Sequence, residues 1–333
     1  MSHTPRPRRR SLLALAVLCS ALALVVGACG DDEESGGAAS GGAEKKSYKM
    51  TLIAGVKGDE FYITMNCGAQ AKAKELGVQL DFQGPQEFDA AQQTPIVNAV
   101  AAKKPDAVLI APTDTKALYA PIKQMADNGT KIVLVDTTLE QPDMAVSQIA
   151  SDNEAGGAEA AKALAELIGG SGKVFVINVK PGISTTDARE KGFVDGAKQA
   201  GLDYVGREYS NDKPETAAAK VKAALQKDSD LKGIFGTNLF SAEGAASGVR
   251  EAGAKEVKIV GFDAGPKQVK DLEDGTVQAL IAQKPADIGS QGVEQAFNAL
   301  EGKPTTAKIG TESTTITKDT LAENQDALYK PSC

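Results

Sequence analysis

The sequence predicts an α/β fold made of two similar Rossmann-like lobes with parallel sheets. Short apolar runs alternate with longer segments in which apolar residues recur every three or four positions. This alternation occurs twice, once from Tyr48 to about Ser151 and again from about Asp152 to Gln283. Because Val, Ile and Leu fill the short runs almost continuously, we expect strands that are covered by helices on both faces.

The strand candidates are short runs bounded by turn residues. In chain order they are 48–56, 78–83, 106–112, 131–136, 173–179, 204–209, 233–238, 257–263 and 277–283. The helix candidates between and after them are 61–77, 90–104, 115–129, 154–170, 215–228 and 288–302. Several of these segments end in Gly, which is typical of helix C-termini. Open α/β lobes bind ligands beyond the carboxyl ends of their strands, so two facing lobes predict a cleft.

Residues 1–28 have the organisation of a secretory signal peptide. Four arginines within 6–10 precede an apolar run from Leu12 to Val26 that is short for a membrane span. The run ends in VGAC, and the small residues before Cys29 resemble the lipobox of bacterial lipoproteins. That resemblance implies cleavage before Cys29 and lipidation of its thiol. The alternative is an ordinary signal peptide that contains a cysteine by chance.

The segment that follows, 29–47, is rich in Gly, Ser, Ala and charged residues. Such a composition cannot bury an apolar core, so it predicts a flexible tether. A lipid anchor at one end and a folded body at the other place the protein outside the cytoplasm, attached to the cell membrane.

Charge and histidine content exclude several classes of function. The full chain carries a net charge of −7, and removal of 1–28, with its four arginines and no acid, makes this −11. An acidic body is a poor partner for nucleic acid phosphates. The single histidine, His3, leaves with the signal peptide, so the mature chain lacks the commonest general base and metal ligand. We therefore expect no enzyme, no metal and no cofactor.

Four cysteines are present, of which Cys19 lies in the signal peptide and Cys29 at the lipidation position. Cys67 and Cys333 remain as an even pair in an oxidising compartment. We expect a disulfide between them, and two free thiols are the alternative.

Nucleotide-binding motifs are missing where this fold would need them. The turn after the first strand reads GVKGDEFY and lacks the G-x-G-x-x-G pattern. The GGSGK stretch at 169–173 follows a predicted helix and precedes a strand, which is the wrong order for a phosphate loop. A helix C-cap followed by a tight turn explains it.

Polar and aromatic residues gather at the predicted carboxyl ends of the strands and at the helix starts that follow. These candidates are Asp59, Phe61, Tyr62, Asp136, Thr137, Arg189, Asn238, Asp263 and Gln283. Carboxylates, amides and a guanidinium bind hydroxyl groups, while aromatic rings pack against the C–H faces of a sugar. Asp and Asn at such positions also cap helices, which is the alternative role for each one alone.

At these residues the chain resembles the ribose-type family of periplasmic sugar-binding proteins, the receptors of ABC importers. The motifs that carry the resemblance are GDEFYITMNCG, VLVDTT, SQIASDNEAGG, DAREKGF, FGTN, VGFDAGP and ALIAQKPADIG, and they span the body in the family's order. The resemblance implies that Phe61 and Tyr62 stack on the sugar and that Arg189 grips its oxygens. It assigns ligand hydrogen bonds to Asp136, Asn238, Asp263 and Gln283.

The chain departs from the ribose pattern at several positions. Thr137 stands where an Arg is usual, Asp59 where Asn is common, and Asn211 where the second lobe usually supplies an aromatic. Phe240 is a candidate to replace the missing aromatic, and core packing is its alternative role. These departures favour a small or acyclic polyol over ribose itself.

The resemblance also implies two lobes joined by three crossings, which make a type I periplasmic binding protein hinge. We expect a first lobe of 48–151 plus 284–313 and a second lobe of 152–283 plus 314–333. A monomer that closes on a sugar or sugar alcohol and then meets an ABC permease is the predicted function. The alternatives are a sensory receptor, a transcription regulator, for which the N-terminus lacks a DNA-binding motif, and a carboxylate glycosidase.

Overall fold

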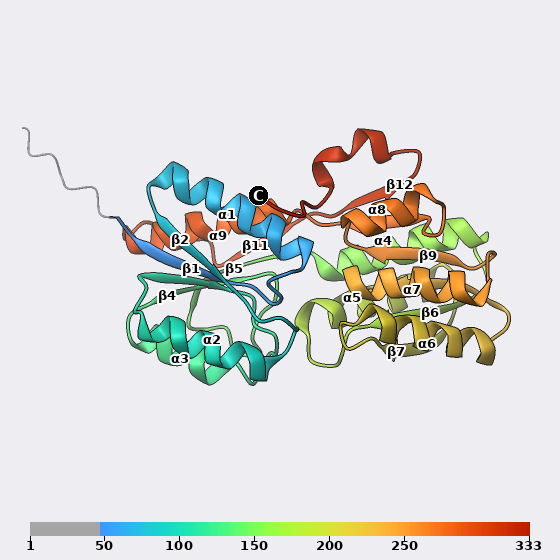
Figure 1. The fold of residues 1–333 in the computed structure, drawn as a ribbon, viewed down its shortest axis with the longest axis horizontal. Coiled ribbons are helices and arrows are strands. Elements are labelled where there is room, and N and C mark those ends of the chain that lie inside the picture. Colours follow the sequence, from blue (N-terminus) through green and yellow to red (C-terminus); the bar gives the residue numbers. More distant parts are fainter. Residues whose placement is uncertain (1–46) are drawn as a thin grey trace, which may run out of the picture. The chain divides into compact units, whose positions relative to one another are not determined.

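Two six-stranded sheets form the core of the structure, which is a computed structural model that describes residues 47–333 (Figure 1). The predictions for 1–46, including the signal peptide, the lipidation of Cys29 and all but the last residue of the tether, lie outside the described residues. The prediction of two α/β lobes with mostly parallel sheets is confirmed. The two sheets have the same strand order. When the strands of each lobe are counted along the chain, the order across the sheet is 2-1-3-4, followed by two further strands at the edge beside strand 4.

The first lobe contains the sheet β11-β5-β4-β3-β1-β2. Its strands are β1 (Lys49–Ile53), β2 (Gln79–Gln83), β3 (Ala107–Ile110), β4 (Lys131–Val135), β5 (Ala145–Ser151) and β11 (Lys308–Thr311). Helices α1 (Glu60–Leu76) and α9 (Pro285–Leu300) cover one face, and α2 (Ala90–Ala102) and α3 (Tyr119–Asp127) cover the other. Neighbouring residues of one strand therefore enter different cores: Leu52 packs under α1, and Ile53 packs under α2 and α3.

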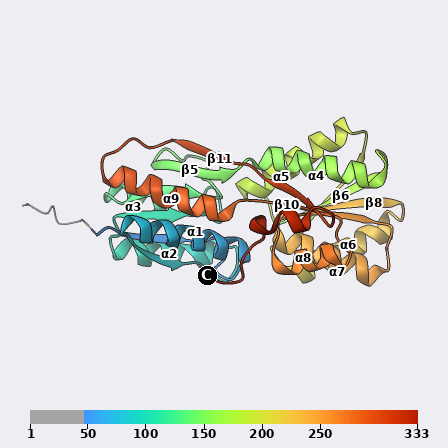
Figure 2. The ribbon, with the colours of Figure 1, turned by 90° about the horizontal axis from the view of Figure 1, so that it is seen from above.

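The second lobe contains the sheet β12-β10-β9-β8-β6-β7. Its strands are β6 (Lys173–Asn178), β7 (Asp203–Tyr209), β8 (Leu231–Gly236), β9 (Lys258–Phe262), β10 (Ala279–Ala282) and β12 (Thr314–Thr317). Helices α4 (Asn153–Ile168) and α5 (Ser184–Gln199) cover one face, and α6 (Pro214–Lys227), α7 (Leu239–Ala252) and α8 (Pro266–Glu273) cover the other (Figure 2). A stacked Phe193–Phe235 pair lies at the centre of the α4–α5 side.

Three strands are absent from the sequence-based prediction: β5, β11 and β12. The residues of β5 are half polar and follow β4 without an intervening helix, so neither the apolar run nor the alternation indicates a strand. Strands β11 and β12 are four residues long and lie at sheet edges, where few buried side chains are needed. β12 pairs antiparallel with β10, which makes it the exception to the parallel pattern in the described residues.

The chain passes between the lobes after β5, after β10 and between β11 and β12. Side chains at these crossings are hydrogen-bonded to one another. Ser151 Oγ donates to Gln283 Oε1 at 2.7 Å and lies 3.3 Å from Thr311 Oγ1. Each crossing therefore contributes one polar side chain to a single buried cluster at the hinge.

Glycines allow one helix pair in each lobe to approach closely. A Cβ at Gly157 of α4 would lie 2.0 Å from the carbonyl oxygen of Arg189, and one at Gly192 of α5 would lie equally close to Glu154 O. The α1–α9 pair has the same arrangement at Gly68 and Gly289. The α4–α5 contact sets the position of the helix turn that carries Arg189.

The chain ends beside α1, where Cys333 forms a disulfide with Cys67. Two short 3-10 turns, Leu321–Glu323 and Gln325–Ala327, precede this end. Among the described residues, no helix combines the length and apolar character needed to cross a bilayer.

Candidate functional site

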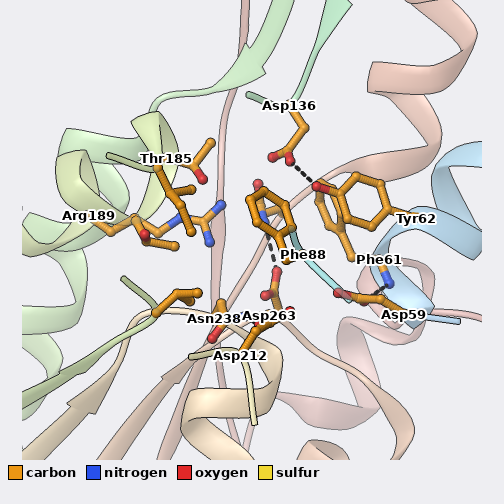
Figure 3. Close-up of a pocket in the computed structure, with 14 residues that line it drawn as sticks. Asp59, Phe61, Tyr62, Phe88, Asp136, Thr185, Arg189, Asp212, Asn238 and Asp263 are labelled. Atoms are coloured by element: carbon orange, nitrogen blue, oxygen red, sulfur yellow. Dashed lines mark hydrogen bonds between the residues drawn. The ribbon is translucent and has the colours of Figure 1, made fainter. Parts of the chain in front are cut away.

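A pocket lies between the carboxyl ends of the two sheets, and its cavity volume is about 40 Å³ (Figure 3). Both lobes line it. The lining residues are Asp59, Phe61, Tyr62, Phe88, Asp136, Val179, Ile183, Thr185, Thr186, Arg189, Asp212, Asn238, Asp263 and Gln283.

The aromatic wall comes from the first turn of α1. Asp59 caps this helix by accepting from the Phe61 N–H at 2.8 Å, so its capping role and its place in the pocket coexist. The rings of Phe61 and Tyr62 meet edge to face with centroids 5.1 Å apart. Tyr62 Oη donates to Asp136 Oδ2 at 2.7 Å, which fixes both side chains against the cavity.

Arg189 enters the pocket from α5 on the opposite side (Figure 3). Its Nε donates to Asn153 Oδ1 at 2.8 Å and its Nη1 to the carbonyl of Thr237 at 3.0 Å. The guanidinium lies 3.8 Å from the centroid of the Phe262 ring. These contacts hold the guanidinium plane, and no hydrogen bond within the described residues engages Nη2.

Asp263 accepts three hydrogen bonds at the place where the second lobe borders the pocket. Its Oδ1 accepts from Gln283 Nε2 at 2.7 Å and from Tyr329 Oη at 2.8 Å, while Oδ2 accepts from the Leu239 N–H at 2.9 Å. Asn238, directly before α7, caps that helix through the Ser241 N–H. The second lobe therefore presents preorganised acceptors.

Asp212 and Phe88 are among the lining residues that are missing from the sequence-based prediction. Asp212, one residue after Asn211, accepts from Asn238 Nδ2 at 2.7 Å and lines the pocket. Phe88 follows β2 and adds a third ring. Phe88 also lies beyond the carboxyl end of a strand, which is the feature that identified the other candidates. The Asp212 backbone has a φ of 60°, a conformation that the sequence does not reveal.

Thr186 contributes a hydroxyl without a partner. Its Oγ1 is fully buried, lacks any hydrogen bond within the described protein and belongs to a residue of the pocket lining. A buried hydroxyl without a partner is unfavourable, so a ligand atom at this point would satisfy it.

Thr137, Asn211 and Phe240 do not line this pocket. Thr137 Oγ1 donates to the carbonyl of Pro112, and the residue borders a separate hollow near the hinge. Asn211 and Phe240 border an outer hollow beside Glu87. Phe88 lines the pocket, whereas Phe240, the sequence-based candidate for a further ring, does not.

Burial perturbs the carboxyl groups of the pocket. It raises the pKa of Asp136 to about 6, although Arg189 and the Tyr62 hydroxyl oppose the change. It raises the pKa of Asp212 to about 6 against the opposing effect of Asn238. The pKa of Asp59 lies well above its usual value because of burial and the nearby charge of Asp263. The site disfavours further negative charge.

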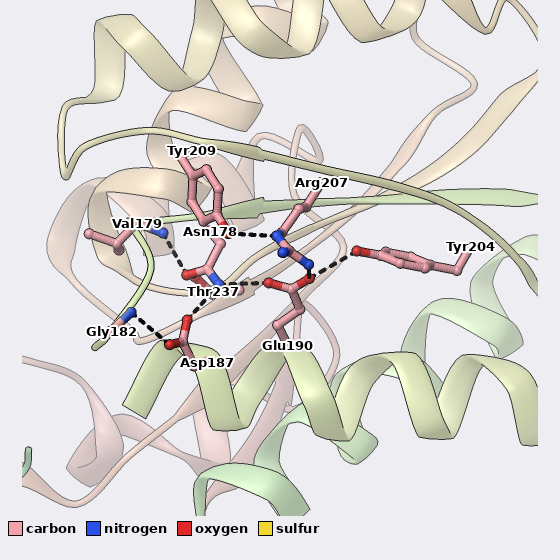
Figure 4. A network of polar contacts seen from close by, with 9 residues as sticks. All are labelled: Asn178, Val179, Gly182, Asp187, Glu190, Tyr204, Arg207, Tyr209 and Thr237. Atoms are coloured by element: carbon pink, nitrogen blue, oxygen red, sulfur yellow. Dashed lines mark hydrogen bonds and ion pairs between the residues drawn. The ribbon is translucent and has the colours of Figure 1, made fainter. Parts of the chain in front are cut away.

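A second polar network centres on Glu190, the residue that follows Arg189 on α5 (Figure 4). Glu190 accepts from Asn178 Nδ2 at 2.7 Å, Arg207 Nη1 at 2.8 Å and Tyr204 Oη at 2.9 Å. The network ties α5 to β6 and β7, so it holds in place the helix on which Arg189, the residue before Glu190, faces the pocket. Glu190 itself is outside the pocket lining.

The lobes touch each other at the rim of the pocket. The Thr138 N–H donates to Ser184 Oγ at 3.0 Å, and Lys180 Nζ donates to the carbonyl of Phe88 at 2.7 Å. Lys213 and Glu87 form an exposed ion pair across the same rim at 3.3 Å. The described residues contain no cluster of His, Cys, Asp and Glu suited to a metal ion.

Residues 50–304 match the protein family described as periplasmic binding protein domain. A ribose import binding protein of Bacillus subtilis is 27% identical over 290 residues, which cover 87% of this chain and 94% of that relative. A D-ribose/D-allose-binding protein of Pseudomonas aeruginosa is 30% identical over 307 residues, which cover 88% of this chain and 95% of that relative.

Solved structures that resemble this chain are also binding proteins of sugar transporters. An ABC transporter solute-binding protein of Agrobacterium vitis with bound α-D-tagatopyranose is 42% identical, with a TM-score of 0.83 over 85% of this chain and 100% of the other. A carbohydrate transporter solute-binding protein of Agrobacterium radiobacter in complex with D-arabinose is 27% identical, with a TM-score of 0.81 over 85% and 99% of the two chains. The chain therefore belongs to the periplasmic binding protein family, and within it to the relatives of ribose-type sugar-binding proteins.

Proposed function

We propose that this protein is the substrate-binding lipoprotein of an ABC importer and captures a small neutral sugar or sugar alcohol between its lobes. The observation that carries the proposal is the pocket between Tyr62 and Asp136 on one side and Arg189 and Asp263 on the other. Sugars bound in the structural relatives support the ligand class. The ligand residues that we propose are Asp59, Phe61, Tyr62, Phe88, Asp136, Thr186, Arg189, Asp212, Asn238, Asp263 and Gln283.

The charges of the pocket support a neutral ligand with many hydroxyl groups. Asp59, Asp136 and Asp212 each use one carboxylate oxygen in a hydrogen bond of the protein, which leaves the other oxygen for ligand donors. Arg189 supplies the single guanidinium among the lining residues. Four carboxyl groups around one cation repel phosphorylated sugars and sugar acids. Hydroxyl groups can donate to the carboxylates and accept from Arg189 at once.

Ligand binding would favour closure because both lobes contribute contacts. A sugar that bridges Asp136 and Arg189 adds binding free energy to the closed arrangement alone, which shifts the population toward it. The rim contacts of Ser184 and Lys180 also join the lobes. The contacts of a ligand would add to them, and the closed surface is the form that a permease would recognise.

The membrane anchor is the part of the proposal that depends on sequence alone. Lipidation of Cys29 after removal of 1–28 would hold the body at the cell surface on a tether that ends at residue 47. Labelling with a radioactive or clickable palmitate tests this, because Cys29→Ser should abolish incorporation and Cys19→Ser should leave it unchanged.

A thermal-shift screen tests the ligand class. The panel contains D-ribose, D-arabinose, D-allose, D-tagatose, xylitol, D-glucitol and galactitol, with D-gluconate and D-glucose 6-phosphate as anionic controls. At least one neutral member should raise Tm in a concentration-dependent way, since a ligand of the native state stabilises it. The anions should have no effect. A panel with no neutral hit, or with stabilisation by anions alone, contradicts the proposal.

A further inference from the structure

Tyr329 lies in the C-terminal tail, defined as 321–333. It does not line the ligand pocket, but it contacts residues that do. Its side chain is buried, with 4% of its surface exposed. The hydroxyl donates to Asp263 Oδ1 at 2.8 Å and accepts from the Gln283 N–H at 3.0 Å. Its ring meets Phe61 at a tilted angle with centroids 5.9 Å apart. One side chain therefore touches three residues of the proposed site.

The tail is attached to both lobes at this point. The Tyr329 N–H donates to the carbonyl of Ala264 in the second lobe at 3.0 Å. The next residue, Lys330, donates its N–H to Thr64 Oγ1 on α1 of the first lobe at 2.7 Å. Three residues later, Cys333 is bonded to Cys67 on the same helix. The disulfide is therefore a covalent attachment of the tail to the first lobe, beyond the three chain crossings.

Beyond Tyr329, few polar contacts join the tail to α1. A hollow of about 340 Å³ lies between tail residues 323–329 and the start of α9. Cys333 is exposed, and its partner Cys67 is half-buried. Without the disulfide, one backbone hydrogen bond among the described residues would still join 330–333 to α1, from the Lys330 N–H to Thr64 Oγ1.

Tyr329 also completes a chain of hydrogen bonds that runs from the hinge to the pocket. Ser151 donates to Gln283, Gln283 donates through Nε2 to Asp263, and Tyr329 bridges Asp263 and the Gln283 backbone. Loss of the hydroxyl would leave the Gln283 N–H without its partner and give Asp263 freedom to rotate.

We propose that Tyr329 is a positioning residue of the ligand site, acting through Asp263 and Gln283, and that the Cys67–Cys333 disulfide keeps it in place. The part that concerns ligand affinity rests on the proposed function. Reduction by a dithiol breaks the S–S bond, transfers two electrons and two protons to form two thiols, and oxidises the dithiol to its own disulfide. The tail is then released, and the affinity for ligand falls.

The first experiment needs no ligand. Hydrogen exchange of the Gln283 amide, followed by ¹⁵N NMR, is compared in the oxidised protein, the dithiothreitol-reduced protein, Tyr329→Phe and Cys333→Ser. Exchange should be at least about tenfold faster in the last three, because the acceptor is displaced or missing. Tyr48→Phe is the matched control. It removes a hydroxyl that donates to Glu301 at 2.6 Å, far along the sequence from the tail, and should leave Gln283 unchanged.

The second experiment measures affinity for D-tagatose, D-ribose and D-glucitol by calorimetry. For any of these that binds the oxidised wild type, Tyr329→Phe, Cys333→Ser and reduction should each weaken binding about tenfold. Reduction should have no further effect on Cys333→Ser, and Tyr48→Phe should bind normally. If Tyr329→Phe does not fold, Cys333→Ser and reduction decide the same question.

Unchanged Gln283 exchange in Tyr329→Phe overturns the positioning role. Unchanged affinity after complete reduction, verified by mass, overturns the role of the disulfide. A wild type that binds none of the panel contradicts the proposed function instead, and the exchange experiment then still decides the role of the tail.

Discussion

Asp136 and Asp263 occupy equivalent places in the two lobes and face the same pocket. Each follows the strand that lies fourth in its lobe along the chain, with a positive φ of 62° for Asp136 and 81° for Asp263. The Asp136 N–H donates to Ile149 O at 2.8 Å, and the Asp263 N–H donates to Ile281 O at 2.9 Å. The same local bend after β4 and after β9 thus aims one carboxyl group from each lobe at the cleft, a strained backbone conformation that is concentrated at functional sites.

Substitution of Asp136 by Asn should separate ligand affinity from stability. Asn tolerates a positive φ and still accepts from Tyr62, but it loses the charge and one acceptor toward the ligand. We expect affinity for a bound sugar to fall by about ten- to one hundredfold. The free energy of unfolding at pH 7 should rise, since burial disfavours the charged carboxylate. Calorimetric titration and urea denaturation measure the two effects.

The control for this prediction is Asp274→Asn, at an exposed residue that follows α8. It should change neither quantity. An Asp136→Asn variant with wild-type affinity would remove Asp136 from the proposed site.

The stability of the ligand-free protein should fall as the pH rises from about 4 to about 6. The pKa values of Asp136 and Asp212 are raised to about 6, so the native state binds more protons than the unfolded chain throughout that window. The free energy of unfolding therefore decreases with pH, by about 2 kcal/mol for each group at most. Urea denaturation at pH 4.5, 5.5 and 7.0 measures the slope.

The double variant Asp136→Asn, Asp212→Asn should show a flatter pH profile than the wild type. Ligand affinity should have the opposite pH dependence and increase from pH 5 to pH 7, because ligand hydroxyls donate to the charged carboxylates. Identical slopes for wild type and double variant would refute the assignment of the two groups.

Arg189→Lys should reduce ligand affinity by about one hundredfold while preserving charge. The lysine ammonium cannot donate to Asn153 and Thr237 in the planar arrangement of the guanidinium or stack in the same way on Phe262. Loss of a charged hydrogen bond to a ligand is worth about 2–3 kcal/mol. The control is the reverse substitution, Lys191→Arg, at a residue on the same helix whose side chain is about three-fifths exposed. This variant should bind the ligand with wild-type affinity. Calorimetric Kd values that match the wild type in Arg189→Lys would contradict a direct contact with the ligand.

Thr186→Val should stabilise the empty protein and weaken the bound complex. The substitution keeps the shape of the side chain and removes a buried hydroxyl that has no partner in the protein. Without ligand, Tm should rise by the equivalent of about 1 kcal/mol, and the ligand-induced increase in Tm should shrink. A lower Tm in the empty variant would show that the hydroxyl has a partner in solution and has no need of a ligand.

The fold is largely predictable from sequence because buried parallel strands leave a strong pattern. Runs such as 131–135 and 258–262 are almost entirely apolar, and each is a strand in the structure. The missed strands β5 and β11 have half their side chains in contact with solvent or lie at an edge, where composition is weakly constrained. Their pairing depends on contacts between segments that are distant in sequence.

The sequence predicts the residues of the candidate site that lie directly beyond the end of a predicted strand. Asp59, Asp136, Arg189 and Asp263 follow from the rule that ligands bind beyond the carboxyl ends of parallel strands, and the structure brings them together. Asn211 comes from the family resemblance and not from this rule, and its neighbour Asp212 lines the pocket instead. The role of Tyr329 leaves no pattern in the sequence, because it depends on a tail that returns to the hinge from the chain end.

We propose that a small neutral polyhydroxyl molecule is held between the lobes in the pocket of Asp136 and Arg189. The most direct test is a crystal structure of the protein grown with the panel member that raises its Tm most. We predict electron density for that molecule within hydrogen-bond distance of Asp136 and the Arg189 guanidinium, with Phe61 or Tyr62 against its carbon face. Density for the molecule elsewhere, with this pocket filled by water alone, would contradict the proposed binding site.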